Sequence, residues 1–102
     1  MSPKEIKLLE CLVTSGKSIC TRKELIKHMW GDVFLNDFDN SLKVIASRAR
    51  TNLAELGVDV EITATVNVGY GIDIEHHAKV RKILADIIKR KTGVDVPWAE
   101  VA

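Results

Sequence analysis

A chain of 102 residues that is 46% hydrophobic and 28% charged has the length and balance of one globular domain with a single core. Its net charge of +1, taken alone, argues against a strong nucleic-acid-binding protein, and no apolar run approaches the roughly 20 residues that a membrane-spanning helix needs. The N-terminus does not resemble a signal peptide either, because Lys4, Glu5 and Lys7 interrupt the stretch that should be apolar. We therefore expect a soluble, cytoplasmic protein with no membrane contact.

The first expected helix begins with a capping box. Ser2 is the expected N-cap, Pro3 takes the first helical position, and Glu5 is placed to close the box. Apolar residues then follow at helical spacing, and Gly16 can adopt the left-handed conformation that the end of a helix often requires. These signals predict a helix that buries one face.

A second helix is expected from Thr21 until Gly31 stops it. Thr21 and Glu24 form a capping box, and the apolar residues that follow keep helical spacing. Residues 18–20 are expected to form a short extended link to this helix. After it, residues 31–38 are expected to form an irregular loop whose apolar side chains pack into the core.

The third helix is expected from Asn40 to Leu56, with Asp37 or Asp39 as its cap. Its apolar residues fall within a narrow arc at about 100° per residue, so that this arc must face the core. The arc consists of Leu42, Ala46, Ala49, Leu53 and Leu56. Gly57 is the expected C-terminal cap.

A β-hairpin is expected after the third helix. Residues 58–66 alternate between apolar and polar or small residues, as in a half-buried strand, and residues 70–74 are its expected antiparallel partner. The link between them contains Asn67 and Gly69, which both tolerate a positive φ. A hairpin is the simplest arrangement that uses these features.

A fourth helix is expected from about His76 to Lys91, because apolar residues lie on one face and lysines and arginines around the other. The predicted organisation is a main domain at residues 1–75, an appended amphipathic basic helix at 76–92 packed on it, and a tail at 93–102 in which Trp98 is the anchor. His76 and His77 are expected to form a solvated entrance to the fourth helix.

Charge is distributed unevenly along the chain. Residues 1–57 contain nine Lys or Arg against seven Asp or Glu, residues 58–75 contain four acids and no base, and residues 76–92 contain six bases against one acid. Any contact with DNA is therefore expected from the first and third of these blocks.

No pattern of catalytic or metal-binding residues rises above chance. Cys11 and Cys20 lie nine positions apart without a CxxC pair, and we expect them to be thiols buried as small hydrophobic residues. Adding His28 with a histidine of the fourth helix gives no recognised zinc spacing, so no metal or other cofactor is expected. Paired carboxylates, Cys-His or Ser-His arrangements and Gly-rich phosphate loops are also lacking, so we expect neither an enzyme nor a small-molecule substrate.

Several short motifs occur together in one order. They are Ser2–Glu10 in the first helix, Thr21–Leu25 and Met29–Gly31 in the second, Ser47–Arg50 and Leu53 in the third, and Val68–Gly71 in the hairpin. In these motifs the chain resembles the OmpR/PhoB-type effector domain of bacterial response regulators, over about residues 2–75. The resemblance implies an α+β, mainly α fold, a winged helix-turn-helix of three helices and a C-terminal β-hairpin wing, to which this chain adds a C-terminal helix.

The resemblance also implies a sequence-specific transcriptional regulator that binds double-stranded DNA. It places the recognition helix at about residues 39–56 in the major groove, the wing in the flanking minor groove, and the 31–38 loop against RNA polymerase. Carried over by position, it makes Arg48 a base reader and Arg50 a phosphate clamp, with Trp30 near a phosphate. We expect two copies, a homodimer, on repeated half-sites. The family normally has a receiver domain before this segment, whereas here Met1 directly precedes the first helix. We therefore expect either a standalone effector or a domain excised from a longer protein.

The residues of the third helix support DNA contact independently. Opposite its core arc lie Asn40, Val44, Ser47 and Thr51, so that small polar residues stand between Arg48 and Arg50 on the two flanks. A guanidinium group can bond guanine in a fork or clamp a phosphate, whereas Ser, Thr and Asn let the helix approach base edges closely. The same pattern also fits an ordinary solvated helix face. The residues expected to contact DNA are Trp30, Asn40, Lys43, Ser47, Arg48, Arg50, Thr51 and Asn67.

The hairpin departs from the family pattern and supports an alternative function. Residues 65–70 lack the arginine of the family's Val-Arg-Gly-x-Gly-Tyr, and the nearby Asp59, Glu61 and Asp73 would repel phosphates. The alternative is a winged-helix protein–protein interaction module that docks through the hairpin and the 31–38 loop on RNA polymerase or another regulator. Three roles stay open for the basic fourth helix: packing on the body with its charges in water, contact with DNA, or a dimer interface.

Overall fold

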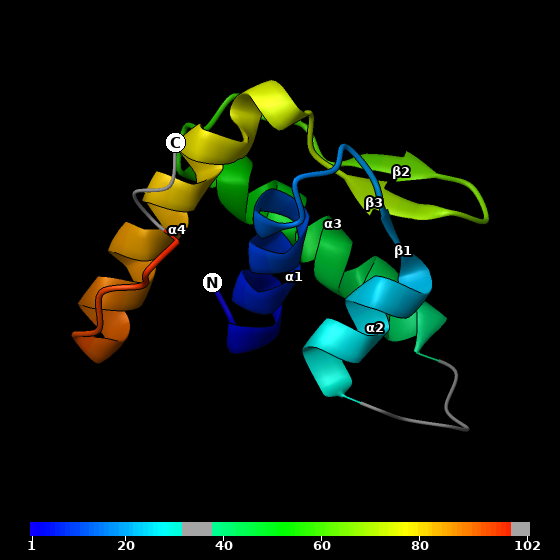
Figure 1. Cartoon of the computed structure of the whole chain (residues 1–102), viewed down its shortest axis with the longest axis horizontal. Coiled ribbons are helices and arrows are strands. Elements are labelled where there is room, and N and C mark those ends of the chain that lie inside the picture. Colours follow the sequence, from blue (N-terminus) through cyan, green and yellow to red (C-terminus); the bar gives the residue numbers. More distant parts are fainter. Residues whose placement is uncertain (32–37, 99–102) are drawn as a thin grey trace.

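A computed structural model describes residues 1–31 and 38–98 of the chain. The predicted order of three helices, a β-hairpin and a further helix is confirmed (Figure 1). The helices are α1 (Pro3–Thr14), α2 (Arg22–Trp30), α3 (Asp39–Glu55) and α4 (His77–Thr92), the strands are β1 (Cys20–Thr21), β2 (Thr63–Thr65) and β3 (Gly69–Gly71), and a 3-10 turn, η1 (Ile74–His76), precedes α4. The predictions for residues 32–37, namely core packing and polymerase contact, lie outside the described residues.

The ends of the first two helices follow the sequence signals. Ser2 Oγ accepts a hydrogen bond from the Glu5 amide at 3.4 Å, and the Glu5 carboxylate accepts from the Ser2 amide in return, which completes the predicted capping box. Thr21 Oγ1 accepts from the Glu24 amide at 3.1 Å. Gly31 ends α2 with φ at 81°, a value that favours glycine because it has no Cβ.

The start of α3 differs from the prediction. Phe38, rather than the predicted Asp37 or Asp39, occupies the N-cap position, and its phenyl side chain makes no capping hydrogen bond. The side chains of Asp37 and Asp39 lie outside the described part of the structure. The Phe38 ring instead stacks on Trp30, the last residue of α2, with ring centroids 4.6 Å apart. An aromatic contact between the two helices therefore sets the point where the chain enters α3.

The sheet has three antiparallel strands in the order β1-β3-β2. The predicted hairpin is present, but the residues expected to be a simple extended link contribute β1, in which Cys20 pairs with Tyr70 of β3. The paired parts of the hairpin are shorter than predicted. At the start of the hairpin, the Val58 amide donates to the Leu53 carbonyl of α3 and not to a neighbouring strand. At its end, Ile74 belongs to the 3-10 turn η1.

Close backbone approach explains the glycines of β3. In the hairpin connection Asn67 has a positive φ of 61°, whereas Gly69 does not use the positive φ that it would tolerate. A Cβ at Gly69 would overlap the carbonyl oxygen of Cys20, and one at Gly71 would overlap that of Ser18. These glycines therefore let the backbone of residues 18–20 approach β3 closely. The need for glycine at positions 69 and 71 comes from the chain at β1, which adds a strand to the predicted hairpin.

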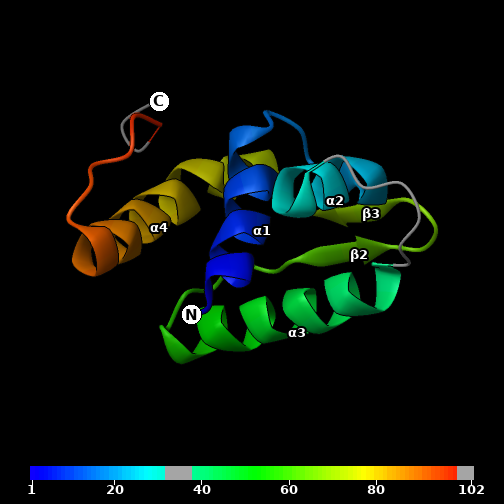
Figure 2. The same cartoon turned by 90° about the horizontal axis from the view of Figure 1, so that it is seen from below.

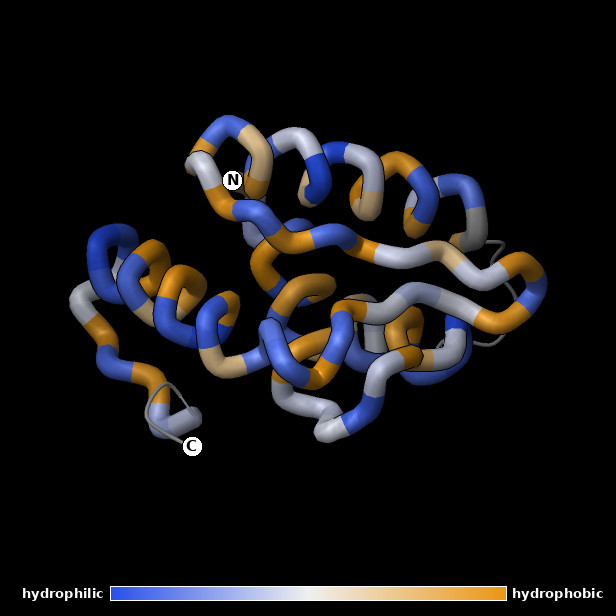
Figure 3. Tube along the Cα trace, turned by 90° about the horizontal axis from the view of Figure 1, so that it is seen from above, coloured by the Kyte–Doolittle hydropathy of each residue, from blue (hydrophilic) through white to orange (hydrophobic). Residues whose placement is uncertain are grey.

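One cluster of buried residues forms the core between α1, α2, α3, the sheet and α4 (Figures 1 and 2). From α3, the cluster contains Leu42, Ala46, Ala49 and Leu53, as the narrow apolar arc predicts. Leu56 was expected in the same arc but is 54% exposed, because α3 ends one residue earlier. Figure 3 shows apolar and polar residues alternating along α3 at the upper edge and along α4 at the left.

The fourth helix packs on the body through its first turns. Val80 and Leu84 have no exposed surface, and the Arg81 guanidinium donates to the Val13 carbonyl of α1 at 3.0 Å. His77 is buried, and its Nε2–H donates to the Ile72 carbonyl at 2.6 Å, so the expected solvated histidine pair is wrong for His77. The distal turns of α4, with Lys89, Arg90 and Lys91, are exposed and extend away from the hairpin (Figure 2).

Within the described residues, no helix combines the length and the apolar character that a membrane crossing requires.

Candidate nucleic-acid interface

Helix α3 lies along one side of the molecule, with α1, α2 and the sheet packed against its other side (Figure 2). Its outward face carries the predicted contact residues of this helix, and all of them are exposed. They are Asn40, Lys43, Ser47, Arg48, Arg50 and Thr51. Thr51 Oγ1 donates to the Ser47 carbonyl one turn earlier at 3.2 Å, which directs this hydroxyl to its own helix.

One hollow of about 400 Å³, here called the Trp30 hollow, lies between α3 and the ends of α1 and α2. Its lining residues are Lys4, Trp30, Asn40, Ser41, Val44, Ile45 and Arg48. The structure thus brings the predicted residues Trp30, Asn40 and Arg48 to one site. The Lys4 ammonium lies 5.0 Å from the centroid of the Trp30 ring and donates to the Met29 carbonyl at 2.7 Å, so this cation is held at the edge of the hollow.

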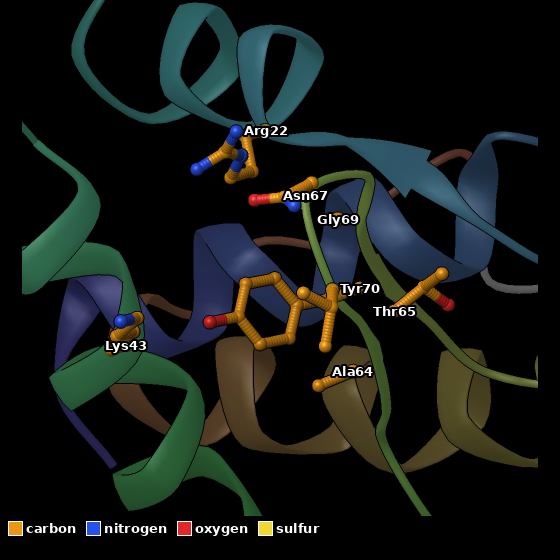
Figure 4. Close-up of a pocket in the computed structure, with 8 residues that line it drawn as sticks. Arg22, Lys43, Ala64, Thr65, Asn67, Gly69 and Tyr70 are labelled. Atoms are coloured by element: carbon orange, nitrogen blue, oxygen red, sulfur yellow. The ribbon is translucent and has the colours of Figure 1, made fainter.

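A second hollow of about 220 Å³, here called the hairpin hollow, lies between α2, α3 and the β2–β3 hairpin. The predicted residues Lys43 and Asn67 line it, together with Arg22 and Tyr70. Figure 4 shows the Tyr70 hydroxyl on the side of Lys43, while Arg22 and Asn67 lie beside one another above it. Two cations, an amide and a hydroxyl thus converge on one concave site, a combination of groups that suits phosphate oxygens.

Lys4, Arg22 and Tyr70 were not among the contact residues predicted from the sequence. Arg22 and Tyr70 stand in the matching motifs, but nothing in their spacing shows that β1 brings the start of α2 beside the hairpin. Lys4 is likewise distant from α3 in the sequence. These residues join the candidate interface only because the tertiary packing brings their elements together.

Arg50 has a partner inside the protein. Its Nε–H donates to the carbonyl of Ile62 at 3.1 Å, in the segment that leads into β2. The guanidinium therefore links α3 to the base of the hairpin, and a phosphate would bind at its terminal nitrogens, which point in other directions from Nε.

The tip of the hairpin carries two exposed valines and no charged residue. Val66 is 85% exposed and Val68 is 42% exposed, on either side of the exposed Asn67. Asp59 and Glu61, which precede β2, are exposed as well. The structure therefore places no cation at the part of the hairpin that projects furthest from the body.

Neither the two cysteines nor a group of potential metal ligands, Asp73, Glu75 and His76, lines the Trp30 hollow or the hairpin hollow. Cys20 is buried as predicted, with its Sγ 3.7 Å from the Cys11 carbonyl, whereas Cys11 is half-buried. Hydrogen bonding from the Cys11 thiol lowers the pKa of Cys20 and correspondingly raises that of Cys11. Asp73, Glu75 and His76 have ligand atoms within 4.8 Å of one another, and all three side chains are at least partly exposed to water.

Helices α1 to α3 followed by the β2–β3 hairpin form a winged helix-turn-helix, with the hairpin as the wing. Residues 1–72 match the family model described as "Transcriptional regulatory protein, C terminal". The chain belongs to this family, the OmpR/PhoB-type effector domains, which are DNA-binding domains of transcription regulators. The predicted resemblance is therefore confirmed. Helix α4 lies beyond the matched residues.

Three curated relatives of the chain are bacterial proteins named as transcriptional regulatory proteins or as a response regulator protein. The chain is 39% identical to the transcriptional regulatory protein YxdJ of Bacillus subtilis, 37% identical to the response regulator protein GraR of Staphylococcus haemolyticus and 33% identical to the transcriptional regulatory protein DltR of Streptococcus agalactiae. These alignments cover 69%, 69% and 72% of this chain but only 30%, 31% and 32% of the relatives. The chain thus spans about a third of their length. No solved structure matched it.

Proposed function

We propose that this chain regulates transcription by binding duplex DNA at specific sequences, with α3 as the recognition helix in the major groove. The observation that carries the proposal is the exposed face of α3, where Arg48 lies among Asn40 and Ser47. Small polar side chains let the helix approach the bases, and a guanidinium group can form a fork to O6 and N7 of guanine.

Phosphate contacts are proposed on both sides of this face. The Trp30 hollow carries the ammonium of Lys4, and the hairpin hollow carries Arg22 and Lys43 with the Tyr70 hydroxyl. A helix in the major groove lies between two phosphate backbones, so cations along both of its sides favour binding and fix its orientation. Arg50 is proposed as a further phosphate contact through its terminal nitrogens.

The wing is proposed to contribute little electrostatic attraction to DNA. Its exposed tip residues are Val66, Asn67 and Val68, and Asp59 and Glu61 before β2 repel phosphates. Binding as two copies on repeated half-sites would supply affinity that a single copy with such a wing lacks. The stoichiometry on a duplex with two half-sites tests this point, and a 1:1 complex would exclude it.

A second candidate function is docking on RNA polymerase or another regulator. The observation that favours it is the wing tip, because two exposed valines without a nearby cation in the hairpin suit a protein surface better than a phosphate backbone. The two functions make opposite predictions about the enrichment of duplex DNA.

The first experiment uses the unaltered 102-residue chain to select binding sites from a random duplex library at low salt. DNA recognition predicts that one sequence is enriched, and failure to enrich any sequence would favour the docking function. On the enriched site, Arg48→Ala should weaken binding by about 1–3 kcal/mol and relax the preference at one base pair.

The matched control is Lys82→Ala, which removes one exposed cation from α4. This variant should leave the preference at every base pair unchanged. If Arg48→Ala weakened binding equally on the enriched site and on a scrambled duplex, Arg48 would be a phosphate contact and base reading by this residue would be refuted.

A further inference from the structure

An apolar residue interrupts the polar face of α3. Val44 is 49% exposed and lies one helical turn from Asn40 on one side and from Arg48 on the other. All three side chains line the Trp30 hollow. A single exposed valine is common on protein surfaces, so the exposure alone has no functional meaning. Its position between two side chains suited to reading bases is what requires an explanation.

The major groove offers one apolar group on unmodified bases. Guanine presents acceptors that suit arginine, adenine presents a donor and an acceptor that suit asparagine, and thymine presents a C5 methyl group. A valine over any other base edge would desolvate polar groups without replacing their hydrogen bonds. A valine over thymine buries a methyl group against its own methyl groups.

Because its side chain is β-branched and stands on a helix, Val44 is a rigid contact residue. A β-branched side chain has one strongly preferred χ1 rotamer in a helix, so little side-chain entropy is lost when it binds. Residues four apart rise by about 6 Å along a helix, so Asn40, Val44 and Arg48 span about 12 Å. That length corresponds to roughly four base-pair steps at 3.4 Å each, so the row can read one short half-site.

We propose that Val44 reads the methyl group of a thymine, in a half-site that presents guanine to Arg48 and adenine to Asn40. The proposal rests on the proposed DNA-binding function and adds the chemistry of the bases that α3 recognises. The Trp30 hollow, bordered on its other side by Lys4 and Trp30, leaves space beside Val44 for the base edge and the adjoining backbone.

The test uses the duplex enriched from the library and a set of duplexes in which one thymine at a time is replaced by deoxyuridine. This replacement removes only the C5 methyl group. At one position of the half-site, deoxyuridine should weaken binding of the unaltered chain about fourfold, the effect of losing one buried methyl group. For Val44→Ala, the same replacement should weaken binding less than twofold.

The matched control is Val66→Ala at the wing tip, which shortens another exposed valine. This variant should keep the full response to deoxyuridine at that position. Binding is also compared between duplexes with cytosine and with 5-methylcytosine at the same position, because 5-methylcytosine is the other base that carries a C5 methyl group. A gain on methylation that depends on Val44 would support the proposal, because the shared C5 methyl is then the group that is read.

The results distinguish a failure of methyl reading from a failure of DNA recognition. An equal response to deoxyuridine at every position by the unaltered chain and by Val44→Ala would overturn methyl reading, while the loss caused by Arg48→Ala would still support DNA recognition. Absence of an enriched duplex would refute the proposed function itself. Urea unfolding of Val44→Ala shows that the comparison is between folded proteins.

Discussion

The substitution Leu84→Ala tests whether α4 is a structural part of the domain. This helix lies beyond residues 1–72, which match the family, yet Leu84 has no exposed surface and belongs to the same buried cluster as the residues of α1 and α3. Truncation of a fully buried leucine to alanine costs about 2–5 kcal/mol, because it removes the transfer free energy and leaves a cavity. A domain of this size has a total stability of about 5–15 kcal/mol. The substitution should therefore remove a large fraction of the folding free energy.

Urea unfolding followed by circular dichroism measures this loss, and thermal unfolding should show a Tm lowered by at least about 8 °C. The matched control is Lys82→Ala, two positions away on the same helix, whose exposed side chain should change the stability by less than about 0.5 kcal/mol. A cost below about 1 kcal/mol for Leu84→Ala, with an unchanged dependence on urea, would refute the conclusion that α4 completes the core.

Three further predictions concern the sheet, the interface and the surface charges. Gly71→Ala should cost about 1–3 kcal/mol in urea unfolding, because the new Cβ meets the backbone of Ser18, and an unchanged midpoint would contradict the close approach of the strands. Arg50→Ala should make the slope of log affinity against log salt shallower by about one unit, and an unaltered slope would remove it from the phosphate contacts. The Lys17 ammonium, followed by the Thr21 hydroxyl, lowers the pKa of Glu24 below its ordinary value of 4.5. The stabilisation is therefore present above that ordinary value and is lost as the pH falls through the lowered pKa. In Lys17→Ala the Glu24 carboxyl, followed by NMR, should titrate at higher pH, and an identical titration would exclude the ion pair in solution.

Local signals in the sequence determined the helices. Ser2 and Thr21 cap helices because their side-chain oxygens reach amides three residues later, an interaction that depends only on neighbouring residues. The apolar arc of α3 predicted the buried residues from Leu42 to Leu53 for the same reason, since helical geometry repeats every 3.6 residues. The matching motifs, read together, also predicted the family and the order of its elements.

Only the tertiary structure decided the features that depend on residues distant in the sequence. The pairing of Cys20 with Tyr70 forms β1 and brings the Cys20 carbonyl so close to residue 69 that only glycine fits there. The sequence of the two residues of β1 does not reveal this pairing. The stacking of Phe38 on Trp30 joins the start of α3 to the end of α2, and the local cap signals in the sequence did not predict this contact.

The candidate site shows the same division. The sequence by itself determined that α3 has an exposed polar face around Arg48, because periodicity separates that face from the core. Only the packing of α1, α2 and the hairpin around α3 decided which cations border this face and formed the two hollows. Each hollow is lined by residues of several elements. Its shape therefore depends on the distances between those elements in the folded protein, which the spacing of residues in the sequence does not specify.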